Sequence, residues 1–228
     1  MKNFSVAVDG PSGAGKSTIS KEISKRMGIL YVDTGAIYRA IGLFVLEQGF
    51  DSKDEAGVNK CLDRIDVKPV FDNGVQHILL NGRDVTEHIR TPEVSRYASD
   101  VSAFGVVRDY LLELQRSLAR DGSVIMDGRD IGTVVLPDAD VKIFLSALPE
   151  VRARRRFLEL VENGTDVSYE EVLTATVERD YNDSTRKIAP LRRADDAIMV
   201  DTTGLRLEES IDLIEKVIRK RIKTCFSK

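Results

Sequence analysis

The stretch FSVAVDGPSGAGKSTISKEISKRM at residues 4–27 decides the fold. Residues 4–8 are rich in apolar and β-branched side chains and predict a strand, whereas apolar residues recur at helical spacing from Lys16 to Met27. Between them lies GPSGAGKS at residues 10–17, which matches the pattern G-x-x-x-x-G-K-[ST]. A strand, a glycine-rich loop and a helix in this order are typical of a phosphate loop.

The chemistry of this loop suits the phosphates of ATP. Glycines let backbone N–H groups turn toward phosphate oxygens, and the N-terminus of the following helix favours an anion. We expect Lys16 to neutralise the β- and γ-phosphates and the Ser17 hydroxyl to hold Mg²⁺. The alternative is a glycine turn beside a surface lysine, which the flanking strand and helix disfavour. The residues predicted to bind ATP are Gly10, Pro11, Ser12, Gly13, Ala14, Gly15, Lys16, Ser17 and Thr18.

Length and composition fit one globular α/β domain. The chain has 228 residues, of which 42% are hydrophobic and 31% charged, and its net charge of -3 gives no overall attraction for nucleic acid. No stretch reaches the roughly 20 apolar residues of a membrane span, and the N-terminus does not resemble a secretory signal. Cys61 and Cys225 lack metal-ligand spacing and fit thiols in a reducing compartment. We therefore expect a cytoplasmic protein without nucleic-acid or membrane partners.

Beyond the phosphate loop, predicted strands alternate with predicted helices, which favours a parallel sheet flanked by helices. The further strands are predicted at 30–32, 123–127, 141–145 and 197–201. The further helices are predicted at 36–48, 52–64, 92–119, 149–162, 168–185 and 206–223. Residues 67–85 differ, because Asn73-Gly74 separates two β-prone runs and predicts a hairpin. This segment is expected to form a small antiparallel insertion.

The segment DTGAIYR at residues 33–39 carries candidate binding residues. We expect Thr34 to cap a helix, with Tyr38 on the same face and Arg39 completing an anion site. A helix cap with a core tyrosine and a solvated arginine remains an open alternative.

The segment DGRD at residues 127–130 follows an apolar strand, at the sheet edge where open α/β proteins bind ligands. There Asp127 could order Mg²⁺ through water. Arg129 could grip a phosphate in bidentate fashion, and Asp130 could accept a hydrogen bond from a base amino group. A polar turn is the alternative.

Two clusters of charged residues lie on predicted helices. One comprises Arg152, Arg155 and Arg156, and the other comprises Arg179, Asp183 and Arg186, provided that the helix persists to 186. A solvated helix face is the usual explanation for such a run. Phosphoryl transfer offers another, because charge on the transferring group must be met by cations.

Taken together, the segments GPSGAGKS, DTGAIYR, EVSRYASDVSAFGVVRD, DGRDIGTVV, VKIFL and ERDYNDSTRKIAPL resemble the bacterial cytidylate kinase family in order and spacing. The resemblance spans nearly the entire chain, and Thr34 stands where some relatives have serine. It implies the fold of the P-loop nucleoside monophosphate kinases in a single domain, 1–228. The implied core covers about 1–66, 89–150 and 187–228, the monophosphate-binding insertion about 67–88, and a short helical lid about 151–186.

The resemblance also implies a role for individual residues. Cytosine would be read by Ser99, Arg108 and Asp130. The CMP phosphate would be held by Arg39 and Arg129, and the sugar contacted by Asp183. Thr34 and Tyr38 would line the acceptor pocket. The residues implied to act on the phosphates in catalysis are Lys16, Arg129, Arg179 and Arg186.

The leading hypothesis is therefore an ATP- and Mg²⁺-dependent kinase for CMP or dCMP, expected to be a monomer that binds only small molecules. A carboxylate such as Asp130 suits this choice, because cytosine has an amino donor where uracil has a carbonyl. A kinase for another monophosphate is the nearest alternative. A nucleotide-dependent switch or binding module is the alternative from another class, but the chain lacks the Asn-Lys-x-Asp motif typical of a guanine-reading switch.

Overall fold

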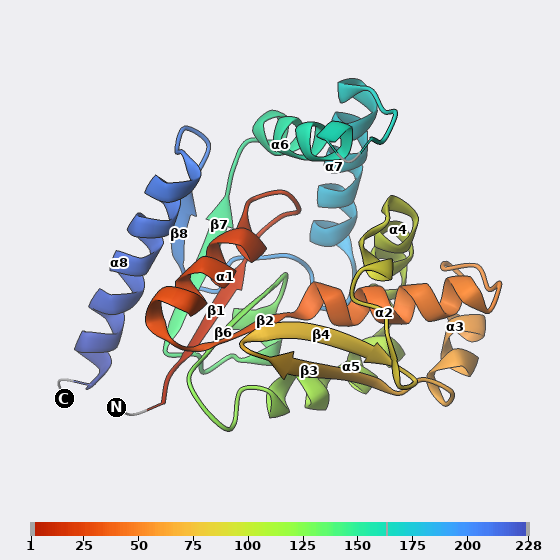
Figure 1. Cartoon of the computed structure of the whole chain (residues 1–228), viewed down its shortest axis with the longest axis horizontal. Coiled ribbons are helices and arrows are strands. Elements are labelled where there is room, and N and C mark those ends of the chain that lie inside the picture. The colour runs from red at the N-terminus through yellow and green to blue at the C-terminus, as the bar shows by residue number, and fades with distance from the viewer. Residues whose placement is uncertain (1–2, 163, 227–228) are drawn as a thin grey trace. The chain divides into compact units, whose positions relative to one another are not determined.

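The computed structural model describes residues 3–162 and 164–226. The chain forms two compact units, one made of Met1–Ile29 and Ser123–Lys228 and the other of Leu30–Gly122 (Figure 1). The elements of the first unit are β1 (Ser5–Asp9), α1 (Lys16–Met27), β6 (Val124–Gly128), the π-helical turn η2 (Ile131–Val135), β7 (Val141–Ser146), α6 (Pro149–Glu162), α7 (Tyr169–Thr185), β8 (Ile198–Asp201) and α8 (Leu207–Phe226).

The first unit is built on a parallel sheet in which β6, β1, β7 and β8 lie side by side in that order. Asp9 at the end of β1 pairs in register with Gly128 of β6 and Phe144 of β7. The central strand is buried, with Val6 and Ala7 fully inaccessible to solvent. This explains why its sequence is a continuous apolar run, as expected for a parallel strand covered on both faces.

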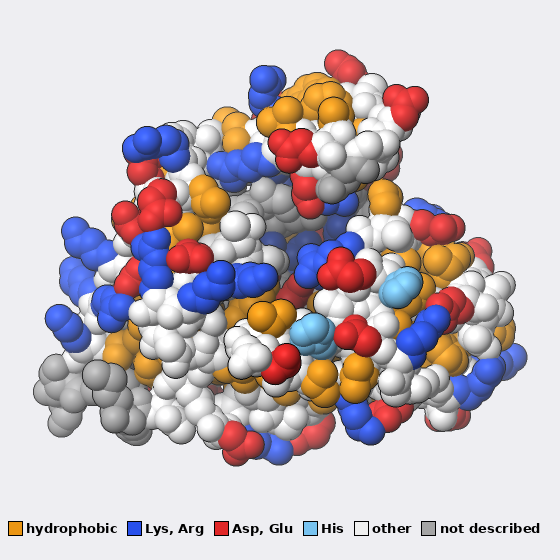
Figure 2. Space-filling view, in the orientation of Figure 1, with side chains coloured by type: hydrophobic (Ala, Val, Ile, Leu, Met, Phe, Trp, Pro, Cys, Tyr) orange, Lys and Arg blue, Asp and Glu red, His pale blue; other side chains and the backbone are white. Residues whose placement is uncertain are grey.

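Helices α1 and α8 lie beside each other in the first unit. Arg26 of α1 donates hydrogen bonds to Glu208, Asp212 and Glu215 of α8. Figure 2 shows Lys and Arg side chains interspersed with Asp and Glu side chains over α8. This helix therefore presents a mixed-charge outer face, as its amphipathic sequence predicts.

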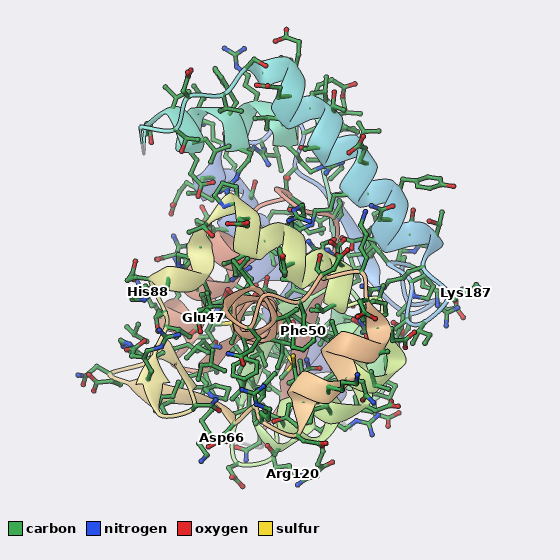
Figure 3. All side chains as sticks on the ribbon, turned by 90° about the vertical axis from the view of Figure 1, so that its right-hand side faces the viewer. Glu47, Phe50, Asp66, His88, Arg120 and Lys187 are labelled. Atoms are coloured by element: carbon green, nitrogen blue, oxygen red, sulfur yellow. The ribbon has the colours of Figure 1, made fainter. Side chains whose placement is uncertain are left out.

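Helices α6 and α7 pack against each other. The rings of Phe157 and Tyr169 meet edge to face with their centroids 6.2 Å apart. Helix α7 begins with a capping box formed by Ser168 and Glu171. It ends at Thr185, so Arg186 lies just beyond the helix and not within it. In Figure 3 the labelled Lys187 marks where the chain continues after Arg186.

The second unit combines helices with the predicted insertion. Its elements are β2 (Leu30–Asp33), α2 (Thr34–Glu47), α3 (Glu55–Leu62), β3 (Val67–Asp72), β4 (Val75–Leu80), β5 (Arg83–Asp84), the short 3-10 helix η1 (His88–Arg90), α4 (Pro92–Val101) and α5 (Gly105–Ser117). Their apolar side chains form one core that includes the buried Ile37, Ile78 and Leu111. Phe50, labelled in Figure 3, packs against this core.

The antiparallel insertion is confirmed, since β3 pairs with β4 and β4 with β5. Asn73 and Gly74 have φ angles of 48° and 77°. A two-residue hairpin turn of type I′ requires positive φ at both positions, which explains why this dipeptide occurs here. Gln76 of β4 connects the insertion to the end of β2, because its side chain accepts from the backbone N–H of Asp33 and donates to its carbonyl.

Two expectations need correction, and one element was missed. Asp33, and not Thr34, caps α2, because the Asp33 side chain accepts a hydrogen bond from the N–H of Ala36 while Thr34 is already helical. The helical pattern at 92–119 consists of two helices, α4 and α5, separated at residues 102–104. The turn at Ile131–Val135 was not predicted, since π-helical turns have no simple sequence period.

Candidate active site

The phosphate loop lies between β1 and α1, as the motif predicts. Gly10 has a φ of 151°, and a Cβ atom there would collide with the carbonyl oxygen of Leu145. The loop can follow this path only with glycine at that position. Lys16 is buried, and its Nζ donates to the carbonyl oxygen of Pro11 over 2.8 Å. Ser17 and Thr18 follow on the exposed side of the first turn of α1.

The two residues predicted to hold Mg²⁺ are in direct contact. The Ser17 hydroxyl donates to Oδ2 of Asp127 over 3.0 Å. Asp127 lies near the C-terminal end of β6 and is only 3% exposed. Hydroxyl and carboxylate oxygens are the ligands that Mg²⁺ prefers, usually with several waters. The donor set at this position therefore fits a magnesium ion bound partly through water, although no group of three or more acidic, His or Cys side chains among the described residues could hold a metal by itself.

A cluster of arginines and carboxylates lies in the same unit. Nε of Arg129 donates to Oδ2 of Asp183 over 2.8 Å. The Arg186 guanidinium lies 3.6 Å from Oδ1 of Asp130 and 4.0 Å from Oδ1 of Asp183. Although burial acts to raise it, the charges of Arg129 and Arg179 hold the pKa of Asp183 below its ordinary value. The segment 127–130 and the cluster on α7, predicted separately, are thus brought together.

Lys16 belongs electrostatically to this cluster. Its burial lowers its pKa to about 7, and the positive charge of Arg129 acts in the same direction. Asp127 raises the pKa, but the other effects outweigh it. A bound anion would raise the pKa of Lys16 again and keep the side chain protonated, so this position favours an anionic ligand.

The second unit brings its own candidates together. The Arg108 guanidinium lies over the ring of Tyr38, 5.6 Å from its centroid, and donates to the carbonyl oxygen of Ser102 over 3.0 Å. The Ser102 hydroxyl in turn donates to the backbone carbonyl oxygen of Ser99 over 2.8 Å. Ser99 at the end of α4, Arg108 on α5 and Tyr38 on α2 are therefore linked.

Arg39 is held by the residue that caps its helix. Its NH2 atom lies 2.8 Å from Oδ2 of Asp33, whose other carboxylate oxygen makes the cap. Nε of Arg39 is buried and has no hydrogen-bond partner among the described residues. A buried donor without a partner costs free energy, and an anion that bound to this guanidinium would remove that cost. Thr34 is buried nearby, at the start of the same helix.

Sequence reasoning gave Arg152 an ambiguous role and did not single out Asp180 or Asp9. Arg152 is buried and does not belong to a solvated face, because its NH1 donates to the carbonyl oxygen of Ser12 over 2.9 Å and to Oδ1 of Asp180 over 3.1 Å. It therefore connects the phosphate loop to α7. Asp180 follows Arg179 directly in the sequence and could have suggested a further ion pair here. Spacing alone, however, does not identify Arg152 as its partner.

Asp9, the residue before the loop, is also part of this arrangement. Its carboxylate accepts from the backbone N–H groups of Ile131 and Gly132 over 2.7 Å and 2.8 Å. Burial raises the pKa of Asp9 to about 6, although these two hydrogen bonds act in the opposite direction. Asp9 thus connects the start of the phosphate loop to the turn that follows Asp130.

This raised pKa predicts a pH-dependent stability. Since the folded pKa lies above the ordinary 3.8, the contribution of Asp9 to stability is fully present below about pH 4 and is lost as pH rises through about 6. The advantage in unfolding free energy of the wild type over Asp9→Asn should fall by up to about 3 kcal/mol across this range. Urea unfolding at a series of pH values measures it. The exposed Asp138→Asn variant should show no such change, and a pH-independent difference for Asp9→Asn would contradict the assignment.

Comparisons with known proteins agree with the resemblance drawn from the sequence. The family model described as cytidylate kinase matches residues 6–220. A protein from Carboxydothermus hydrogenoformans named cytidylate kinase is 51% identical over 216 residues, covering 95% of this chain and 97% of that protein. Another of that name from Caldicellulosiruptor saccharolyticus is 51% identical over 222 residues, covering 97% and 98%.

Among solved structures, an uncharacterized protein from Eubacterium ventriosum has a similar fold, with a TM-score of 0.51 at 14% identity over 98% of this chain and 99% of that one. The helices of the described residues include none that is both long and apolar enough to cross a membrane. The family model covers nearly the whole chain, and about half of the aligned residues are identical between this chain and each of the two relatives, over nearly their full length. The chain therefore belongs to the cytidylate kinase family.

Proposed function

We propose that this protein transfers the γ-phosphoryl group of ATP to CMP or dCMP, giving CDP or dCDP, as the name of its family indicates. The observation that carries the proposal is the buried Lys16 of the phosphate loop, whose Nζ donates to the Pro11 carbonyl oxygen. Its burial, and after that the charge of Arg129, lower its pKa to about 7. Buried cations at a phosphate loop suit the triphosphate and the charge that spreads over the phosphoryl group during transfer.

The chain's own residues position and neutralise the reacting groups. A phosphate oxygen of CMP, already ionised near neutral pH, attacks the γ-phosphorus of ATP in line while the bond to the β-phosphate oxygen breaks, so no general base is required. Lys16 exchanges the Pro11 carbonyl for the β- and γ-phosphates, and the incoming negative charge raises its pKa and keeps it protonated. Arg129, Arg179 and Arg186 meet the charge on the transferring group.

Ser17 and Asp127 would hold Mg²⁺, the Asp127 carboxylate through water. When bound, the ion would neutralise charge on the β- and γ-phosphate oxygens.

The residues that we assign to the acceptor nucleotide are those that the family resemblance implies. We assign the cytosine base to Ser99, Arg108 and Asp130, and the sugar to Asp183. The CMP phosphate is assigned to Arg39 and Arg129, and the acceptor pocket to Thr34 and Tyr38. The buried Nε of Arg39 supports an anion there, and the stack of Arg108 on Tyr38 supports a fixed orientation of that guanidinium. The negative charge of Asp130 supports selection of a base with an exocyclic amino donor.

A monomeric state, a cytoplasmic location and the division into core, insertion and lid are part of this proposal. Light scattering of the purified protein tests the first of them.

The proposed activity is tested with a panel of acceptors. With ATP and Mg²⁺, CMP and dCMP should give diphosphate products at rates well above those with UMP, AMP or GMP. UMP presents a carbonyl oxygen to the buried Asp130 carboxylate where cytosine presents an amino donor. Chromatographic separation of the nucleotides measures this. A preference for another monophosphate would identify a different kinase. Slow ATP hydrolysis without any diphosphate product from the acceptor would favour a nucleotide-dependent switch.

A further inference from the structure

The turn Ile131–Val135 is capped by a residue that is far away in the sequence. The first N–H groups of any helical turn have no acceptor within the turn. Here Asp9 supplies both acceptors, since Oδ1 receives the N–H of Ile131 over 2.7 Å and Oδ2 that of Gly132 over 2.8 Å. Asp9 is only 4% exposed, so water does not compete effectively for these bonds. Both oxygens of one buried carboxylate are thus engaged by two consecutive residues of the turn.

The residue that ordinarily caps such a turn is the one directly before it. That residue is Asp130, a residue type strongly preferred at this position. Its side chain nevertheless makes no capping hydrogen bond, and its backbone has a φ of -144°. One of its carboxylate oxygens lies 3.6 Å from the Arg186 guanidinium. The Asp130 side chain is therefore oriented toward the arginine cluster, and the capping hydrogen bonds are instead accepted by Asp9 at the end of β1.

We propose that Asp9 is a positioning residue for base recognition, which caps the Ile131–Val135 turn and so keeps the Asp130 carboxylate turned toward Arg186. This inference rests on the proposed function, in which Asp130 reads cytosine. A side chain of Asp130 that capped the turn would turn toward the backbone N–H groups and away from its present position near the Arg186 guanidinium. Asp9 also precedes Gly10, the first residue of the phosphate loop. The same side chain therefore fixes the spacing between that loop and the base-reading carboxylate.

The variant Asp9→Asn tests the cap with little change in size. Its amide has one acceptor oxygen, so one N–H of the turn loses its acceptor and Asp130 becomes the nearest carboxylate that can replace it. We expect the ratio of kcat/KM for CMP over UMP to fall at least about 5-fold, the size of one hydrogen bond, with a smaller change in KM for ATP. In an Asp130→Ala background the same change should leave the ratio unaltered, because the two residues act on one contact.

A supporting role for the phosphate loop alone would give a different result. It would raise KM for ATP or lower kcat for both acceptors equally and leave the CMP to UMP ratio at the wild-type value, which would overturn the inference. The exposed Asp138→Asn is the matched control, since it makes the same chemical change at an exposed position three residues after the Ile131–Val135 turn. A wild type that phosphorylates no monophosphate would instead reject the proposed function, so the two failures can be told apart.

A second measurement tests the cap without relying on activity. Hydrogen exchange of the Ile131 and Gly132 amides should be slow in Asp130→Ala, and at least one of them should exchange at least about 5-fold faster once Asp9→Asn is added, because Asp130 can then no longer replace the lost acceptor. An unchanged exchange rate of both amides would contradict the proposal that Asp9 caps the turn. If Asp9→Asn fails to fold, Gly132→Ala tests the same point, because the added Cβ would lie 3.3 Å from Oδ2 of Asp9 and crowd the bond. That variant should also lower the CMP to UMP ratio, and an unaltered ratio would contradict the inference.

Discussion

Replacing Lys16 with alanine should reduce kcat by at least about 100-fold, the loss typical of removing one preorganised group that stabilises a transition state. Lys16 is buried beside the phosphate loop, and its burial and the charge of Arg129 lower its pKa to about 7. Its positive charge is therefore costly in the empty protein and becomes favourable only when phosphates enter. For the same reason the variant should be at least as stable as the wild type to thermal unfolding.

The measurement is the rate of CDP formation at saturating ATP and CMP, together with the melting temperature. Lys21→Ala is the matched control, because it removes an exposed lysine from the same helix. It should leave both quantities close to the wild-type values. A folded Lys16→Ala protein with nearly full activity would remove the phosphate-loop assignment.

Asp130→Ala and Arg129→Ala should fail in different ways, although the two residues are adjacent. Asp130 is proposed to accept from the cytosine amino group. Its loss should therefore lower kcat/KM for CMP by a factor that corresponds to ~1 to 3 kcal/mol of transition-state stabilisation, and it should reduce the preference for CMP over UMP. Arg129 is proposed to hold phosphate, which every monophosphate carries. Its loss should therefore depress turnover of CMP and UMP by similar factors, of the order of 100-fold or more.

The deciding quantity is the CMP to UMP ratio of kcat/KM in each variant. Because Arg129 also pairs with the buried Asp183, its replacement leaves that carboxylate with one fewer partner, and thermal unfolding must accompany the kinetics. The ratio is insensitive to a partial loss of folded enzyme. An unchanged ratio in Asp130→Ala would withdraw the assignment of cytosine to this carboxylate, even if the protein remains a kinase.

The parts of the fold that could be predicted from the sequence have local causes. The phosphate loop and the Asn73-Gly74 hairpin need particular backbone angles at particular positions, and only a few residue types supply them. The helix α1 was predicted with its observed ends, because Gly28 stops it in the left-handed conformation. The family resemblance added the roles of Ser99 and Arg108, which no local pattern would have indicated.

The parts that could not be predicted depend on partners distant in the sequence. Arg152 has the spacing of a solvated helix face, and its burial follows from contacts with Ser12 and Asp180. The capping role predicted for Thr34 belongs to Asp33, since either residue type can cap a helix and the choice depends on where the chain leaves β2. From the sequence alone, Asp9 is only the polar residue at the end of a strand, because the two N–H groups that donate to its carboxylate lie 122 and 123 residues further on.

These separations determine when the phosphate site can form during folding. Ser17 meets Asp127 across 110 residues, and Arg152 meets Ser12 across 140. Contacts of this range require the closure of long chain segments and are slow to form. During synthesis from the N-terminus, the glycine-rich loop emerges among the first residues but lacks these supports until α6 has been made. A nascent chain or a truncated product thus carries the nucleotide-binding motif without a working site, and catalytic competence is a late event in its biogenesis.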